Sequence, residues 1–232
     1  EAGHDVLALE KGRRLSDDDL LKARTDARAY LWQPEVGMRG FFWQRIMRHV
    51  AVIGGSGVGG GSIVWAGVLL TPPKAFYQDP TWAGLNEDWE AELAPHLETA
   101  SRMLGRVRSP FVGEMDRHLE ETARAMGAHS SYGPVPVAIH FGREGVTEPD
   151  PFFDGAGPER TGCRLCGECL LGCPYGAKNQ LTRNYLWLAE RAGARIQAES
   201  QVSSITPLTG GGYEVSIKHP WKRGGERTLR AR

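Results

Sequence analysis

The sequence has no excess of charge of either sign, because its 28 basic residues are matched by 28 acidic ones. Without a basic surplus it carries no electrostatic signature for nucleic acid or an anionic membrane. It also has no long hydrophobic run: the stretch IVWAGVLL, residues 63–70, is far too short to span a bilayer. The N-terminal letters EAGHDVLALEKG do not have the shape of a signal peptide. We therefore expect a cytoplasmic protein with no nucleic-acid partner and no membrane span.

Cysteine is scarce, and all of it lies in one run, CRLCGECLLGCP. The spacing C-x2-C-x2-C-x3-C, formed by Cys163, Cys166, Cys169 and Cys173, is that of bacterial ferredoxins and predicts a [4Fe–4S] cluster. In ferredoxins, however, the fourth cysteine of such a run serves a second cluster, and this chain has no second run. Zinc usually takes its ligands from two separated pairs. A cluster, a zinc ion and a structural thiol loop therefore remain as alternatives.

Glycine is abundant instead, with 30 residues, which argues against a simple helical protein and for a loop-rich α/β domain. Six glycines fall within residues 54–61, in the letters GGSGVGGG, and include a G-x-G-x-x-G pattern. A dinucleotide-binding fingerprint predicts a strand ending in an acid roughly 20 residues further on. Here that region reads TPPKAFYQDPTW, in which Pro72 and Pro73 oppose a central strand. The pattern therefore predicts either a ligand-contacting loop of another kind or a tight turn without a ligand.

A better candidate for a ribose-binding acid lies upstream. Residues 5–10, DVLALE, are typical of a buried parallel strand that ends in Glu10. An acid at the end of such a strand accepts hydrogen bonds from ribose hydroxyls. The alternative is that Glu10 is simply a solvated residue at the end of a strand.

The remaining elements follow from capping residues and periodicity. One helix is expected from a Ser16 cap to about Trp32, before Pro34. A second is expected after an Asn86 cap. Further helices are expected at about 114–126 and 181–191, with strands near 135–141, 194–198, 201–206 and 213–217. Lys178 and Asn179 are expected at a helix start, on the surface.

Three segments together resemble the glucose–methanol–choline (GMC) family of FAD-dependent oxidoreductases, closest to its bacterial cholesterol-oxidase-like branch. GGSGVGGGSIVWAGV resembles the second glycine motif of the family, and EAGHDVLALEKG resembles the strand after its first fingerprint. ESQVSSITPLTGGGYEVSI resembles the segment whose valine backbone meets the adenine of FAD. Residues 72–160 match only loosely. By this resemblance the chain is expected to be an internal fragment, without the first glycine fingerprint and the C-terminal catalytic part.

The resemblance implies an α/β fold: an FAD/NAD(P)-binding Rossmann-like domain with an inserted α+β portion of a substrate domain. Residues 1–71 would form the first part of the FAD-binding domain and 72–160 the insertion. Residues 161–232 would carry the cysteine run and return to the FAD-binding domain. Glu10 would hold the adenosine ribose and Val202 the adenine. The other cofactor contacts implied are Gly57, Gly60, Gly61, Ser62, Trp65 and Val68.

One position departs from the family. Relatives often carry asparagine at or near the place of Trp65, so a side-chain hydrogen bond to the flavin is not carried over there. Trp65 and Val68 are expected either to pack on the flavin or to belong to the core. Backbone contacts from residues 60–62 do not depend on this difference.

The chemistry implied is oxidation of a CH–OH group of a small-molecule alcohol, with hydride transfer to flavin N5 and reoxidation by oxygen or another acceptor. The catalytic base of the family would lie beyond residue 232, so no catalytic residue is assigned and these 232 residues alone are expected to be inactive. The aromatic and Met content of residues 72–160 suits an apolar, sterol-like alcohol, although an aromatic core accounts for it equally well. The alternative function is an iron–sulfur or metal-binding electron-transfer module built on the cysteine run.

Overall fold

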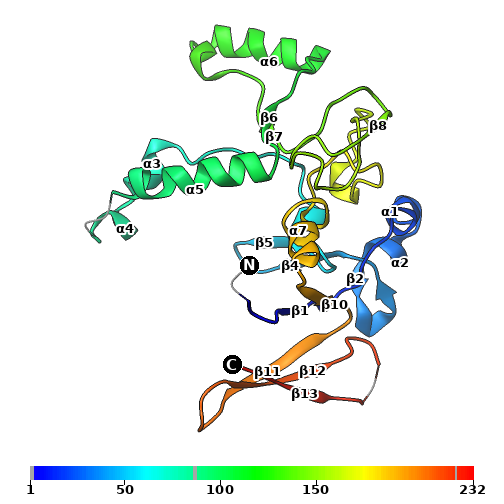
Figure 1. Cartoon of the computed structure of the whole chain (residues 1–232). Coiled ribbons are helices and arrows are strands. Elements are labelled where there is room, and N and C mark those ends of the chain that lie inside the picture. The colour runs from blue at the N-terminus through cyan, green and yellow to red at the C-terminus, as the bar shows by residue number, and fades with distance from the viewer. Residues whose placement is uncertain (1–2, 86–87, 223) are drawn as a thin grey trace. The chain divides into compact units, whose positions relative to one another are not determined.

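The computed structural model describes residues 3–85, 88–222 and 224–232 (Figure 1). They form two compact units, Glu1–Ala66 with Phe141–Arg232, and Gly67–His140. Both mix short helices and strands, and the sheets of the described residues contain two or three strands each. The division of the sequence at residues 71 and 160 stays a prediction.

The first unit contains the parallel strand pair expected from the sequence. Strand β1 (Leu7–Leu9) pairs in parallel with β10 (Arg195–Gln197), with Leu7 opposite Arg195 (Figure 1). The expected burial of β1 is wrong, since Leu7 is 36% exposed and Ala8 is also exposed. The reason is that β10 is the one strand paired with β1 in the described part of the chain, so little covers its faces.

The helix expected from Ser16 to about Trp32 is divided in two. Helix α1 (Asp17–Lys22) begins at a Ser16 cap, as predicted, and Asp19 completes a capping box. Helix α2 (Ala27–Tyr30) begins at its own cap, Asp26, whose carboxylate accepts the Arg28 N–H. An aspartate that bonds nearby backbone competes with helix continuation, so the chain turns there. The apolar face of this region forms a core of Leu20, Ala23, Phe41, Ile63 and Val64.

Replacing Ser16 with alanine is expected to lower the free energy of unfolding by about 1 kcal/mol, because the Asp19 backbone N–H loses its side-chain acceptor. Urea unfolding measures this change. Ser204→Ala, at an exposed serine of a distant strand, is the matched control and should change stability by less than about 0.5 kcal/mol. Equal effects of the two substitutions would contradict the role of the cap.

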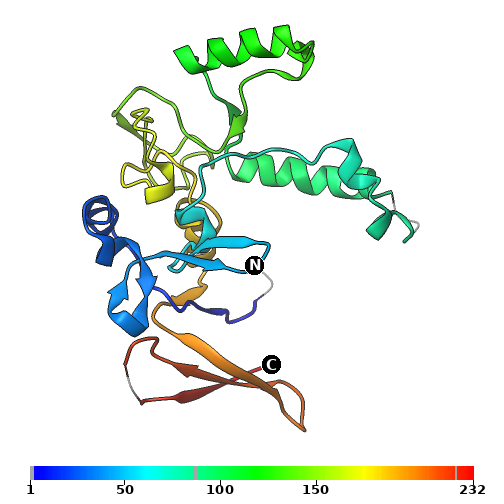
Figure 2. The same cartoon turned by 180° about the vertical axis from the view of Figure 1, so that it is seen from behind.

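The glycine-rich stretch follows an antiparallel hairpin. Strand β4 (Phe42–Ile46) pairs with β5 (Ala51–Gly55), and the short 3-10 helix η2 (Gly60–Ile63) follows (Figure 2). A Rossmann fingerprint instead joins a parallel strand to an α-helix and leads to another strand. Residues 74–83 contain the short helices α3 (Lys74–Tyr77) and α4 (Pro80–Ala83) where that strand would lie. The rejection of the fingerprint interpretation is therefore confirmed.

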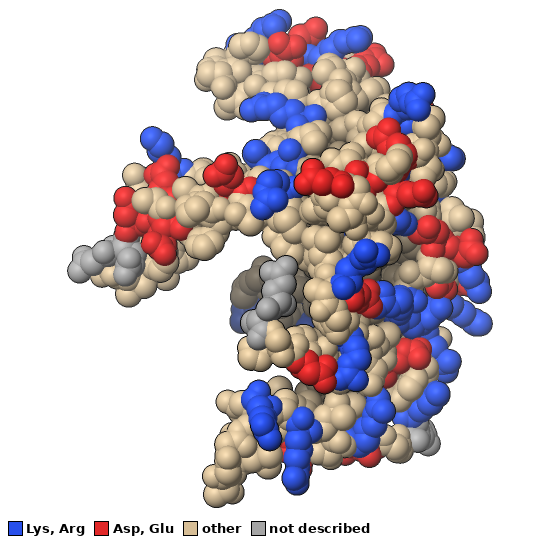
Figure 3. All heavy atoms as spheres, viewed as in Figure 1, with Lys and Arg blue, Asp and Glu red and all other residues tan. Residues whose placement is uncertain are grey.

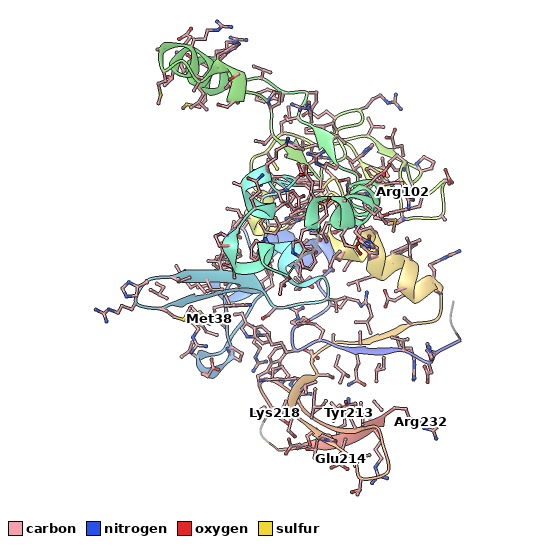
Figure 4. All side chains as sticks on the ribbon, turned by 90° about the vertical axis from the view of Figure 1, so that its left-hand side faces the viewer. Met38, Arg102, Tyr213, Glu214, Lys218 and Arg232 are labelled. Carbon is pink, nitrogen blue, oxygen red and sulfur yellow. The ribbon has the colours of Figure 1, made fainter. Side chains whose placement is uncertain are left out.

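The C-terminal part of the first unit contains the predicted hairpin. Strands β11 (Gln201–Pro207), β12 (Tyr213–Lys218) and β13 (Arg227–Ala231) form an antiparallel sheet, in which Figure 4 labels Tyr213, Glu214 and Lys218 on β12. The expected helix at 181–191 begins later: η5 (Leu181–Arg183) precedes α7 (Tyr185–Arg191), whose first N–H is capped by the Asn184 side chain. The other elements of this unit are β2 (Trp32–Gln33), η1 (Pro34–Val36), β3 (Met38–Arg39), β8 (Thr147–Glu148), β9 (Arg160–Thr161) and η4 (Cys169–Leu171).

The second unit is dominated by two helices, α5 (Trp89–Met103) and α6 (Glu114–Ala125), the latter as predicted. The expected cap at Asn86 lies outside the described residues, and the Asp88 side chain caps α5. The edge strand expected at 135–141 is confirmed only as the short β7 (Pro136–Val137), paired with β6 (Val107–Arg108). The short helix η3 (His129–Ser131) completes the unit.

The sequence predicts neither a membrane span nor a surface of one charge sign. No helix of the described residues has both the length and the apolar character that crossing a membrane requires. On the face drawn in Figure 3, Lys and Arg side chains are intermixed with Asp and Glu side chains.

Candidate functional site

The carboxylate of Glu10 connects the end of β1 to the glycine loop. Its Oε1 atom accepts the backbone N–H of Gly12 at 2.7 Å and that of Gly57 at 3.0 Å. The backbone of Glu10 continues the β1–β10 pairing, donating to the Gln197 carbonyl at 3.0 Å and accepting from the Ser200 N–H at 2.8 Å. The carboxylate of Glu10 is therefore held by the turn after β1 and by the glycine loop, and it is not a freely solvated strand end. Only Oε1 takes part in the hydrogen bonds found within the described residues.

Gly12 makes this connection possible, although no local sequence pattern marks it as a functional residue. Gly12 is buried, and a Cβ atom there would overlap the Gly57 nitrogen and lie 2.6 Å from the Ser56 carbonyl oxygen. The turn after β1 and the glycine loop thus touch backbone to backbone. A glycine at this point permits a close approach that any side chain would prevent.

The glycine loop combines a fixed side with an open side. The Ser62 hydroxyl donates to the Gly59 carbonyl at 2.6 Å and accepts the Leu181 N–H at 3.0 Å, which anchors η2 to residues further along the chain. A Cβ at Gly60 or Gly61 would meet no atom within 4 Å, so the backbone there borders open space. Gly60 also has a φ of +53°, which favours glycine. An extended ligand can approach the main chain at these two residues.

Trp65, Val68 and Val202 lie in three different settings. Trp65 is half-buried, and its indole Nε1 is a buried donor without an acceptor among residues 3–85, 88–222 and 224–232. Val68 is 43% exposed and forms a bridge with Val137 inside the second unit, so the alternative that it is a core residue is wrong. Val202 lies on β11 opposite Ile217 and is 37% exposed. The structure thus brings together Glu10 and Gly57, while the contacts of these three residues with a cofactor remain predictions.

The four cysteines do not form a preassembled metal site. None of the described residues belongs to a group of three or more His, Cys, Asp or Glu side chains placed to hold a metal ion. All four are free thiols; Cys166 is exposed and the other three are half-buried. Burial raises the pKa of the Cys163 and Cys169 thiols, and neighbouring thiols of the run act in the same direction. A raised pKa lowers the fraction of thiolate, which is the nucleophilic form of cysteine.

Two charged residues near this run, Lys178 and Arg160, are fully buried. Lys178 and Asn179 are each 0% exposed, so their expected surface position is wrong. The Lys178 ammonium donates to the carbonyl oxygens of Ile63 at 2.8 Å, Trp65 at 2.9 Å and Cys169 at 2.6 Å. Arg160, also 0% exposed, donates to the Asn179 side chain. These hydrogen bonds explain the burial, because a buried cation needs acceptors for its N–H groups.

The sequence profile of the family described as GMC oxidoreductase matches residues 34–218. The chain belongs to this family. A cholesterol oxidase of Mycobacterium tuberculosis is 43% identical over 240 aligned residues, covering all of this chain and 41% of that protein. A cholesterol oxidase of Acinetobacter baumannii is 39% identical over 243 aligned residues, covering all of this chain and 44% of that protein. The chain thus spans less than half the length of these curated relatives, and the resemblance drawn from its glycine and strand segments is confirmed.

Proposed function

We propose that the full-length protein is an FAD-dependent oxidoreductase that oxidises the CH–OH group of an alcohol. The observation that carries this proposal is the junction of Glu10 with the glycine loop, found in a chain of the GMC family. The carboxyl end of a parallel strand is where open α/β sheets bind their ligands. We further propose that β1 and β10 belong to the Rossmann-like sheet of an FAD-binding domain.

The residues present fit such a cofactor. Glu10 Oε2 remains available for a ribose hydroxyl while Oε1 is fixed by Gly12 and Gly57. Open space beside Gly60 and Gly61 admits the pyrophosphate and flavin part. The Trp65 indole, which has no acceptor within the described part of the chain, offers a hydrogen-bond donor. Ser62, Val68 and Val202 keep the contacts proposed for them from the resemblance. When bound, FAD supplies N5 as the hydride acceptor, and the chain's own part is to hold and orient it.

For the substrate, we propose an apolar, sterol-like alcohol. The names of the Mycobacterium and Acinetobacter relatives indicate cholesterol as the substrate of those proteins. Within the second unit, a groove of about 550 Å³ follows α6 and is lined mainly by apolar side chains, among them Phe111, Leu119, Met126 and Val135. An apolar groove of this size suits a rigid hydrocarbon skeleton.

The experiment that tests the proposal starts with the absorption spectrum of the purified full-length protein. Paired near-ultraviolet and blue bands of a flavin support it, and anaerobic bleaching by cholesterol but not by ethanol supports the substrate class. Hydrogen peroxide formation in air identifies oxygen as the acceptor, and a requirement for an added dye indicates another acceptor. A protein without flavin absorption contradicts the proposed function.

An iron–sulfur or zinc centre on the cysteine run is the second candidate, and no geometric observation favours it. Iron, zinc and acid-labile sulfide assays on the same sample decide the question. A protein that contains FAD and no bound metal would exclude the metal centre, whereas iron and sulfide in a 1:1 ratio would support an iron–sulfur cluster.

The cytoplasmic location also stays a prediction, which cell fractionation tests.

Replacing Glu10 with glutamine is expected to weaken FAD binding by about 10- to 100-fold, since charge-assisted hydrogen bonds contribute about 1.5–3 kcal/mol. The measurement is FAD titration of the apoprotein, followed by flavin fluorescence. Glu35→Gln, at an exposed residue of the same unit, is the control and should leave affinity unchanged. An affinity within twofold of the wild type for Glu10→Gln would show that this carboxylate does not hold the ribose.

A further inference from the structure

Lys178 occupies an unusual position for a lysine. Its side chain is fully buried, and its ammonium donates to three backbone carbonyls, two from the end of the glycine loop and one from the cysteine run. An ammonium has three N–H donors, so these carbonyls account for all of them. The three acceptors are main-chain atoms rather than carboxylates, which makes this contact a cross-link between loops and not an ion pair.

Burial of this kind is costly, which indicates that the cross-link matters. Desolvation lowers the pKa of Lys178 to about 8, while the nearby Cys169 and Cys173 act in the opposite direction. A methionine or leucine would fill the same space without that cost. The Ile63 and Trp65 carbonyls, however, would then lose the donor that Lys178 provides, while the Cys169 carbonyl would keep only its bond from the Gly172 N–H.

The cross-link acts on the part of the glycine loop that is proposed to face the flavin. The Ile63 and Trp65 carbonyls lie directly after Gly60, Gly61 and Ser62 in the chain. Three residues beyond Lys178, the Leu181 N–H donates to the Ser62 hydroxyl, which is a second tie between the same two segments. Residues 178–181 therefore hold the loop at three points, the carbonyls of Ile63 and Trp65 and the hydroxyl of Ser62.

We propose that Lys178 is a positioning residue for FAD: it fastens the glycine loop to the cysteine run, so that residues 60–65 keep the conformation that receives the cofactor. This inference rests on the proposed function, because it takes FAD as the occupant of the open side of the loop. It also gives the cysteine run a role without metal chemistry. The Cys169 carbonyl, which belongs to this run, accepts one of the three hydrogen bonds of the cross-link.

The test uses the full-length protein and its Lys178→Met variant, whose unbranched side chain is one atom shorter and has no donors. We expect the FAD dissociation constant to rise at least tenfold and the amides of Val64 and Trp65 to exchange hydrogen faster in the apoprotein. Lys178→Arg, which restores charge and donors in a planar group, should fall between the variant and the wild type. Lys22→Met, at an exposed lysine of α1, is the matched control and should change neither measurement.

An FAD dissociation constant within twofold of the wild type for Lys178→Met would overturn the inference. If that variant does not fold, hydrogen exchange of the wild type decides. FAD should then protect the amides of Leu171 and Gly172 in the cysteine run as well as those of Val64 and Trp65, and protection confined to the glycine loop would overturn the inference. A wild type that binds no FAD would overturn both the proposed function and this inference. If the inference is wrong and the proposed function is right, the wild type and the Lys178→Met variant bind FAD equally well.

Discussion

Alanine at position 12 is expected to lower the free energy of unfolding of the full-length protein by about 3 kcal/mol and to weaken FAD binding at least tenfold. The added methyl group would overlap the backbone of Gly57 and lie 2.6 Å from the Ser56 carbonyl oxygen. Backbone atoms cannot rotate away as a flexible side chain can, so the turn after β1 and the glycine loop must separate. That separation would break the hydrogen bond from Gly57 N–H to Glu10, which joins the two segments.

The measurements are urea unfolding of the apoprotein and FAD titration of the same samples. Gly210→Ala is the matched control, because Gly210 has no atom within 4 Å of an added Cβ and no left-handed φ. Its alanine variant should be as stable as the wild type or slightly more so. An unchanged stability of Gly12→Ala would show that the two segments can move apart freely, and the junction proposed to bind the ribose would then not be rigid.

Glu10 and Gly12 show how far sequence reasoning reaches. The position of Glu10 at the end of a strand followed from a local pattern of apolar residues that ends in an acid, and the parallel pairing of that strand is confirmed. The need for glycine at position 12 follows from a contact with residues 56 and 57, more than 40 positions away. Nothing in the local letters EKG distinguishes this glycine from one in any solvent-exposed turn.

The same limit explains the error at Lys178. A lysine after a loop and before a helix is normally exposed, because lysine is among the residue types that are least often buried in folded proteins. Its burial depends on three carbonyl groups that are brought together by chain segments up to 115 residues apart. The Ser16 cap, in contrast, needs only the three residues that follow it, and it was predicted correctly.

The predicted burial of β1 is wrong for a related reason. A continuous apolar run predicts a strand covered on both faces, yet covering a strand requires other elements to pack there. Within the described residues β1 has one neighbouring strand, so Leu7 remains partly exposed. Local pattern therefore identified the element and its direction, whereas its surroundings depend on the tertiary packing.

Methionine in place of Arg160 is expected to lower the free energy of unfolding by about 3 kcal/mol, because three buried acceptors would lose their donors. The guanidinium donates to the Gly176 carbonyl at 2.7 Å, the Asn179 side-chain oxygen at 2.7 Å and the Ala177 carbonyl at 3.3 Å. It also lies 5.0 Å from the centre of the Phe152 ring. Burial lowers the pKa of Arg160 to about 10, with Arg183 acting in the same direction, so Arg160 is still charged near neutral pH.

These contacts fix residues 176–179, the segment that carries Lys178 to the glycine loop. Loss of Arg160 should therefore also weaken FAD binding, by roughly three- to tenfold, through displacement of that segment rather than through any contact with the cofactor. Calorimetry of the apoprotein and FAD titration measure the two effects. Arg164→Met is the control for removing a charge from this part of the chain. Arg164 is exposed, and its guanidinium lies 4.4 Å from the Tyr175 ring. This substitution should lower the free energy of unfolding by less than about 1 kcal/mol. If Arg160→Met were destabilised while its FAD affinity stayed that of the wild type, residues 176–179 would contribute to the fold without supporting the cofactor site.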